Sequence, residues 1–157
     1  MTKESKAQLR KAVVADAKPI YTLIGQSAQN NEMLARSLSD IYECIRDFQI
    51  CENDGQIVGC CALHVTWDDM AEIRSIVVDG SLRGNGFGMA MVRQCIAEAK
   101  ALGINRIFVL TYIPLYFQRL GFREVSKDVL PHKVWSECVK CPKFPDCGET
   151  AMVLEKL

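Results

Sequence analysis

The sequence predicts one domain of the α/β (α+β) class, in which helices flank a mixed, mostly antiparallel sheet with a central parallel pair. Residues 48–51 and 57–65 are apolar runs joined by a turn that contains Asp54-Gly55, and together they predict a β-hairpin. An apolar run at residues 106–111 follows a strand and a long helical pattern, an order that predicts a right-handed parallel crossover. Because 157 residues is the length of an ordinary domain, we expect the whole chain, 1–157, to fold as one.

The other elements follow from hydrophobic periodicity and from turn residues. An apolar run at residues 9–14 predicts a first strand, after which Asp16 opens an amphipathic helix with Ile20, Leu23 and Ile24 on one face. The remaining expected elements are a helix in two pieces at 33–46 with a solvent-exposed entry, a strand at 71–78 that pairs antiparallel with 57–65, a helix at 86–102, a short helix from Pro114, and a last strand at 151–154.

Charge and composition exclude several classes of partner. The 19 basic residues balance the 19 acidic ones and form no stripe with aromatics, so we expect no nucleic-acid partner. Residues 1–10 lack the apolar core of a secretory signal, and no apolar run approaches the roughly 20 residues that span a bilayer. We therefore expect a cytoplasmic protein without a membrane partner and with reduced cysteines. Four of the eight cysteines are expected in the core, namely Cys44, Cys60, Cys61 and Cys95.

A glycine-rich turn, Arg-Gly-Asn-Gly-Phe-Gly at residues 83–88, separates a strand from the long helix. Glycines let a backbone approach a ligand closely, and the first helical turn offers amide hydrogens without internal partners. A Walker loop requires lysine and then serine or threonine after its last glycine, but Met89 and Ala90 follow here. A Rossmann fingerprint requires a different glycine spacing and an acid where this chain has Leu110-Thr111. The turn thus favours another phosphate-bearing ligand, with a purely packing role as the alternative.

Two motifs in the correct order resemble the GNAT family of acetyl-coenzyme A dependent N-acetyltransferases. Residues 83–88 fit the family's R-x-x-G-x-G signature, and Leu-Gly-Phe at residues 120–122 fits its later L-G-F element, although Gly80 stands where the family usually has proline. The resemblance implies a GNAT fold whose parallel strands splay at the cofactor site, and acetyl-CoA as the co-substrate. It places these residues at coenzyme A: Ile76, Val77, Val78, Arg83, Gly84, Asn85, Gly86, Phe87, Gly88 and Met89.

Acetyl transfer to an amine requires a neutral amine and stabilisation of an oxyanion. Glu72 occupies a position where relatives in this family often place a base, and its alternative role is that of an exposed strand carboxylate paired with a cation. The resemblance implies that a backbone amide near Ile76 or Val77 stabilises the oxyanion.

The thiolate must also leave, and many GNAT enzymes protonate it with a tyrosine four residues before the glycine of L-G-F. That residue is Phe117 in this chain. The neighbouring Tyr112 and Tyr116 are the candidate catalytic tyrosines, with packing beside the cofactor as their alternative role. A reference thiol pKa of about 8.5 lets a thiolate leave near neutral pH without this acid.

The segment at residues 110–122, followed by 129–133, resembles the catalytic domain of bacterial N-acetylglutamate synthases, which also lacks that tyrosine. The tail at residues 133–147 resembles short, stand-alone members of this subgroup and the acetyltransferase tail of some argininosuccinate lyases. The implied product is N-acetyl-L-glutamate, the first intermediate of arginine synthesis. A dicarboxylate acceptor needs cations, each of which could instead be a solvated surface residue. The candidate cations are Arg74, Lys133 and Arg119.

A cysteine-rich, irregular segment is expected at residues 131–149. Cys138, Cys141 and Cys147, with His132 nearby, are residue types that zinc prefers. They supply only one paired set of ligands, so we favour a packed cysteine-rich loop and expect no bound metal. Three functions stay open: an amino-acid acetyltransferase, an enzyme for polyamine or protein amines, and a non-catalytic CoA-sensing or interaction domain. A homodimer is compatible with each of them.

Overall fold

The computed structural model describes residues 7–30, 35–130 and 148–157. The strands are β1 (Ala7–Lys11), β2 (Phe48–Asn53), β3 (Gln56–Trp67), β4 (Met70–Val78), β5 (Arg106–Thr111), β6 (Arg123–Val125) and β7 (Thr150–Glu155). The α-helices are α1 (Ala17–Gln29), α2 (Leu38–Glu43), α3 (Phe87–Ala101) and α4 (Pro114–Gln118). Short 3-10 helices are η1 (Val14–Asp16), η2 (Ile45–Asp47), η3 (Gly80–Leu82) and η4 (Lys127–Val129).

The strands form one mixed sheet in the order β1-β2-β3-β4-β5-β7-β6. β4 and β5 run parallel, whereas β1, β2 and β3 pair antiparallel in sequence and β7 pairs antiparallel with both β5 and β6. This topology confirms the predicted fold class, including the central parallel pair. The chain divides into two compact units, the first of Met1–Leu63 and Ile73–Glu98, the second of His64–Glu72 and Ala99–Leu157.

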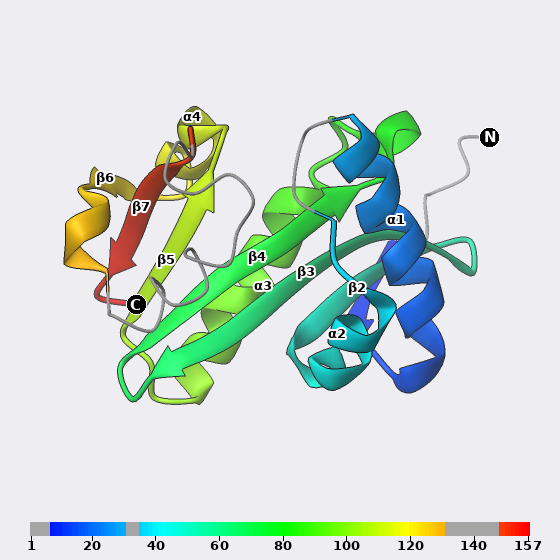
Figure 1. Cartoon of the computed structure of the whole chain (residues 1–157), viewed down its shortest axis with the longest axis horizontal. Helices are drawn as coiled ribbons and strands as arrows, with labels where there is room; N and C mark the ends of the chain where they lie inside the picture. The colour runs from blue at the N-terminus through cyan, green and yellow to red at the C-terminus, as the bar shows by residue number, and fades with distance from the viewer. Residues whose placement is uncertain (1–6, 31–34, 131–147) are drawn as a thin grey trace. The chain divides into compact units, whose positions relative to one another are not determined.

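In the first unit, α1 and α2 cover one face of the strands and α3 covers the other (Figure 1). The apolar face of α1 is the predicted one, since Ile20 and Ile24 are fully buried and Leu23 is nearly so. They pack in one cluster with Phe48 of β2 and Val77 of β4. This packing fixes α1 beside the strand that leads to the glycine turn.

The opposite face requires a glycine where α3 crosses β3. A Cβ at Gly59 would lie 3.0 Å from Met91 Cε and 3.1 Å from the Val77 carbonyl oxygen. Next to it, the buried thiols of Cys61 and Cys95 lie 3.6 Å apart. α3 therefore packs directly on the strand backbone, which holds the first turn of the helix in a defined place.

In the second unit, β5 pairs with the start of β4 on one side and with β7 on the other. Its core joins Met70, Phe108, Leu130 and Val153, all nearly inaccessible. The three-residue strand β6 was not predicted, because it is too short and too exposed to show an alternating pattern.

A charged network ties the start of the chain to β2. Arg10 donates to both carboxylate oxygens of Asp16, at 2.8 and 2.9 Å, and its Nε donates to Glu52 at 2.9 Å. Asp16 Oδ2 also accepts from the Val13 amide at 2.7 Å. The Arg10 guanidinium is the main cause of the lowered pKa of Asp16, and the two carboxylates raise the pKa of Arg10. Because the Val13 amide is bonded to Asp16, it is not available to a neighbouring strand, and β1 ends at Lys11 rather than at residue 14.

Three expectations need correction. The helix expected at 33–46 begins only at Leu38, because Ser37 accepts a hydrogen bond from the Asp40 amide and caps it; residues 33 and 34 lie outside the described part. The entry to this helix is not simply exposed, since the Arg36 side chain is 13% accessible. Cys44 is half-buried rather than a core residue, whereas the other three expected core cysteines are fully buried. In the described residues, every helix is too short or too polar to cross a bilayer.

Candidate functional site

The turn between β4 and α3 is built by local hydrogen bonds. The Asp79 carboxylate accepts from the amide of Ser81 at 3.0 Å and from its hydroxyl at 2.8 Å, contacts that lower the pKa of Asp79. The Asp79 amide donates to Val58 of β3 at 2.7 Å, and Asn85 Nδ2 donates to the Leu82 carbonyl at 2.9 Å. These contacts shape the turn although Gly80 lacks the rigidity that proline would give.

Two glycines of the turn have a backbone conformation that other residues rarely adopt. Gly84 has φ 90° and Gly86 has φ 79°, and a Cβ on either would enter open space. The Ala90 amide donates to the Gly86 carbonyl at 3.0 Å, so the amides of residues 87–89 belong to the helical turn that lacks i−4 partners. The turn therefore combines an open, glycine-lined approach with helical amides that lack i−4 partners, two features that suit an anion.

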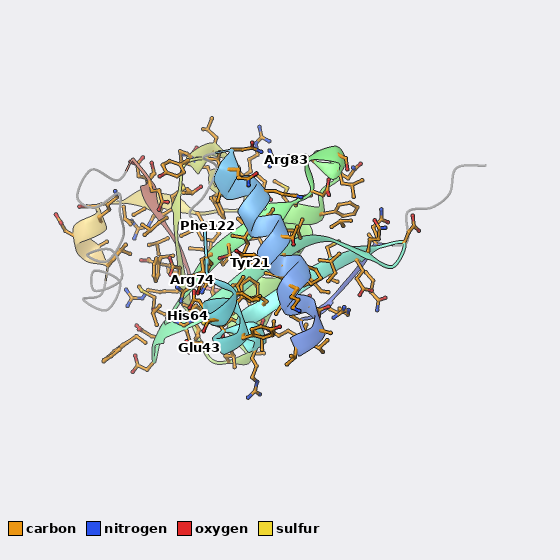
Figure 2. The ribbon with its side chains drawn as sticks, turned by 45° about the vertical axis from the view of Figure 1, so that its right-hand side comes forward. Tyr21, Glu43, His64, Arg74, Arg83 and Phe122 are labelled. Atoms are coloured by element: carbon orange, nitrogen blue, oxygen red, sulfur yellow. The ribbon has the colours of Figure 1, made fainter. Side chains whose placement is uncertain are left out.

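A pocket of about 160 Å³ lies beside this turn, entirely within the first unit. One wall comprises Val77, Val78, Asp79, Gly80 and Arg83, and the other comprises Leu23, Gln26 and Ser27 of α1 with Asn30, the C-cap of that helix. Figure 2 shows Arg83 beside the C-terminal end of α1. The α1 wall was not predicted, because only tertiary packing places the end of that helix beside the turn.

The strand that feeds the turn changes character along its length. β4 is in register with β5 only from Met70 to Glu72, which agrees with the predicted splaying of the parallel pair. Farther along, Ser75 has φ 57°, a left-handed conformation that is uncommon for a residue with a Cβ. Cys60 Sγ lies 3.4 Å from the Ser75 carbonyl, and burial raises the pKa of this thiol to about 12, so it stays a neutral donor.

Arg36 is a residue of the site that sequence reasoning missed. Its Nη1 donates to Ser75 Oγ at 3.1 Å, and its guanidinium carbon lies 5.7 Å from the centre of the Phe48 ring. The same guanidinium pairs with Asp40. A signal was present in the sequence, since arginine and aspartate four residues apart frequently pair at a helix.

The second unit holds all three predicted catalytic residues, Glu72, Tyr112 and Tyr116. Glu72 is 9% exposed, so it is not the solvated strand carboxylate that was weighed as its alternative role. Phe117 is 1% exposed and makes edge-to-face contacts with Tyr116 and Phe122, at centroid distances of 5.2 and 5.4 Å. Tyr112 is 38% exposed, at the end of β5.

The predicted acceptor cations are distributed unevenly. Arg74 is half-buried on β4, two residues beyond Glu72, whereas Arg119 is exposed after α4. Lys133 lies outside the described residues, as do all four members of the cysteine and histidine cluster: His132, Cys138, Cys141 and Cys147.

A model of the acetyltransferase (GNAT) family matches residues 14–122, a span that includes β4, the glycine turn and the Leu-Gly-Phe element. The chain belongs to this family. It is accordingly an acetyl-CoA-dependent N-acetyltransferase, and the predicted family and enzyme class are confirmed.

Two relatives of this GNAT chain align over most of their length. An uncharacterised N-acetyltransferase of Chlorobaculum tepidum is 39% identical over 145 residues, 92% of this chain and 94% of the relative. An amino-acid acetyltransferase of Mycobacterium tuberculosis is 35% identical over 82% of this chain and 75% of its own length.

Solved structures extend the similarity. N-acetylglutamate synthase from Neisseria gonorrhoeae, complexed with coenzyme A and N-acetyl-glutamate, has a TM-score of 0.89 at 27% identity, covering 99% of this chain and 36% of the synthase. A Mycobacterium tuberculosis protein in complex with CoA has a TM-score of 0.82 at 31% identity, covering 96% and 99% of the two chains. This GNAT chain therefore spans about a third of the gonococcal synthase.

Proposed function

We propose that this GNAT enzyme transfers the acetyl group of acetyl-CoA to the α-amino group of an amino acid, with L-glutamate as the preferred acceptor. The donor assignment rests on the turn at residues 83–88, whose positive-φ glycines and first helical amides suit a pyrophosphate. Arg83 adds a charge-assisted contact to the same group, and the adjacent pocket takes the start of the pantetheine arm along Val77 and Val78.

The acceptor assignment rests on the relatives and on chemistry. An amino-acid acetyltransferase is among the relatives, and the gonococcal synthase was solved with N-acetyl-glutamate. Glutamate brings two carboxylates, and Arg74, Arg119 and Lys133 are the cations we assign to them.

In the proposed reaction, the amine nitrogen attacks the thioester carbonyl carbon, a C–N bond forms, the C–S bond breaks and coenzyme A leaves as thiolate. Glu72 removes the proton of the amine, directly or through water, and its burial suits a base shielded from bulk solvent. An amide of Ile76 or Val77 stabilises the developing oxyanion. Tyr112 or Tyr116 protonates the thiolate, or water does, because Phe117 carries no hydroxyl.

The direct test measures N-acetylated product by mass spectrometry, since the eight cysteines would react in a thiol-release assay. Glutamate, glutamine, aspartate, arginine, spermidine and a short peptide serve as parallel acceptors. We expect glutamate to give the highest kcat/KM and intersecting initial-rate lines, as attack in a ternary complex requires. Parallel lines would instead indicate an acetyl-enzyme. Binding of CoA without turnover on any acceptor would favour the CoA-sensing alternative.

Glu72→Gln tests the base. We expect kcat to fall by about 10²- to 10⁴-fold and its dependence on pH to steepen, because a variant without the base reacts only with the fraction of the amine that is already neutral. Glu124→Gln, which removes an exposed carboxylate from β6, is the matched control and should behave as wild type. An unchanged kcat and pH profile in Glu72→Gln would remove this residue from the mechanism.

We propose further that residues 1–157 act as one acetyltransferase domain. That the protein forms a homodimer, lies in the cytoplasm and acts in arginine synthesis are predictions from the sequence. Zinc content measured on freshly purified protein tests the expectation of no metal at the cysteine cluster.

A further inference from the structure

Ser75 sits in the middle of β4 with φ 57°. Such a conformation costs free energy for a residue with a Cβ, and it persists only where the surroundings hold it. The dihedral angles of Ser75 set the direction of the next peptide groups, which include the amides of Ile76 and Val77. Whatever holds Ser75 therefore decides where these amides point.

Two contacts within the first unit hold Ser75. Arg36 Nη1 donates to its hydroxyl oxygen at 3.1 Å, and Cys60 Sγ donates to its carbonyl oxygen at 3.4 Å. The side chain and the backbone of the left-handed residue are thus each restrained. Of the two donors, Arg36 comes from an irregular segment and needs support of its own.

Asp40 supplies that support. Arg36 Nε and Nη2 approach the same carboxylate oxygen, Asp40 Oδ2, at 2.8 and 2.7 Å. The guanidinium also lies over the ring of Phe48, which is fully buried. With the Arg36 side chain 13% exposed, these contacts fix both the position and the plane of the guanidinium.

Helix stability does not account for Arg36. It precedes Ser37, the N-cap of α2, and a cation at a helix N-terminus gains nothing from the helix dipole. Asp40 lies in the first turn of α2, where its amide donates the N-cap hydrogen bond to Ser37 Oγ at 3.1 Å, while its carboxylate is left to pair with Arg36. The chain of contacts runs in one direction, from the first turn of α2 through Arg36 to the backbone of β4.

We infer that Asp40 is a positioning residue, which holds Arg36 against Ser75 and thereby fixes the left-handed turn of β4 that aims the Ile76 and Val77 amides. Its effect on turnover rests on the proposed function, in which one of these amides stabilises the oxyanion. Asp40 itself touches no reacting atom in this account.

Asp40→Asn keeps the shape of the side chain and removes its charge. We expect kcat to fall by about 10- to 100-fold, because misaimed donors at a reacting carbonyl cost rates of this order. Affinity for acetyl-CoA, measured by calorimetry, should change far less, since the turn at residues 83–88 has its own hydrogen bonds. Equal kcat in the variant and the wild type would overturn the inference.

Rescue separates positioning from a general loss of structure. Glycine adopts positive φ without the Cβ penalty, so Ser75→Gly added to Asp40→Asn should restore most of the lost kcat. A mere stabilising role of Asp40 in α2 would predict no recovery. Ser37→Ala is the matched control for α2, because it removes the N-cap but leaves the Arg36–Asp40 pair. If Ser37→Ala lowers kcat as much as Asp40→Asn, the inference is wrong.

Glu43→Gln controls for removal of a carboxylate from α2, since Glu43 is exposed at the end of that helix (Figure 2).

A measurement on the free protein, without any acceptor, keeps the test of this inference separate from the proposed function. In the free protein, amide NMR shifts and hydrogen exchange at Ile76 and Val77 should change in Asp40→Asn and return in the double variant. Unchanged shifts and exchange rates of these amides would refute the inference even if glutamate proves to be the acceptor. Changed values would support it even if glutamate proves not to be the acceptor.

Discussion

Gly86→Ala tests the assignment of the glycine turn to the pyrophosphate. Gly86 has φ 79° and open space where a Cβ would lie, so alanine meets no steric contact within the protein. It nevertheless pays the left-handed penalty of about 1–2 kcal/mol. The added methyl also projects into the space through which a phosphate would approach the amides of residues 87–89.

This free-energy penalty lowers the stability of the folded protein, the affinity for acetyl-CoA, or both in part. If the variant keeps the turn, unfolding free energy falls by about 1–2 kcal/mol, which for a chain of this size lowers Tm by roughly 2–8 °C. If the turn relaxes to avoid the strain, the same free energy weakens acetyl-CoA binding by about 5- to 30-fold. The methyl in the cradle adds to the loss of affinity in both cases.

Gly103→Ala is the matched control, because Gly103 has φ 81° and equally open surroundings but follows α3 at its other end. Calorimetric titration with acetyl-CoA and thermal unfolding should be measured on both variants. We expect similar strain in both and weaker binding in Gly86→Ala alone. Wild-type affinity in Gly86→Ala would refute the assignment of the turn to the phosphate.

Two further predictions concern stability. Asp16→Asn should lower the unfolding free energy by about 2 kcal/mol at neutral pH, because it breaks charge-assisted hydrogen bonds to the partly exposed Arg10. Since the folded pKa of Asp16 is lowered, this contribution is complete above the unfolded pKa of about 3.9 and is lost as pH falls through the folded value. Urea titrations of both proteins from pH 7 to 2.5 should therefore show the difference in unfolding free energy shrinking below about pH 3.9. Gly59→Ala should cost about 1–3 kcal/mol by forcing Met91 away from β3, and unchanged urea stability would contradict the packing described.

Local sequence signals predicted the elements whose geometry is local. The hairpin turn was predicted from Asp54-Gly55, and both residues have positive φ, at 51° and 79°. β5 was predicted with its observed bounds, Arg106–Thr111, because it is an apolar run between a helix and a turn residue. The glycine turn belongs to the same group, since its glycines and the helix that follows are adjacent in sequence.

The features that were missed depend on contacts between distant residues. The α1 wall of the pocket, with Gln26 and Asn30, is a polar helix surface in the sequence and becomes a wall only after α1 packs on the sheet. In the sequence alone, Arg36 is indistinguishable from a solvated surface cation. Its burial arises from the ring of Phe48 and from the hydroxyl of Ser75, which is 39 positions along the chain. Hydrophobic periodicity contains no information on such encounters.

β4 shows why a uniform apolar pattern can conceal three different environments. Its first residues pair with β5, Ser75 turns left-handed, and its end enters the glycine turn. A strand satisfied on both edges would have no amide left to bind a thioester or a pantetheine arm, so release from β5 after Glu72 is a requirement of the chemistry proposed for it. Arg36, which precedes α2, and Cys60 of β3 then hold the released segment, so the fold of the first unit, and not the strand sequence, is the source of its geometry.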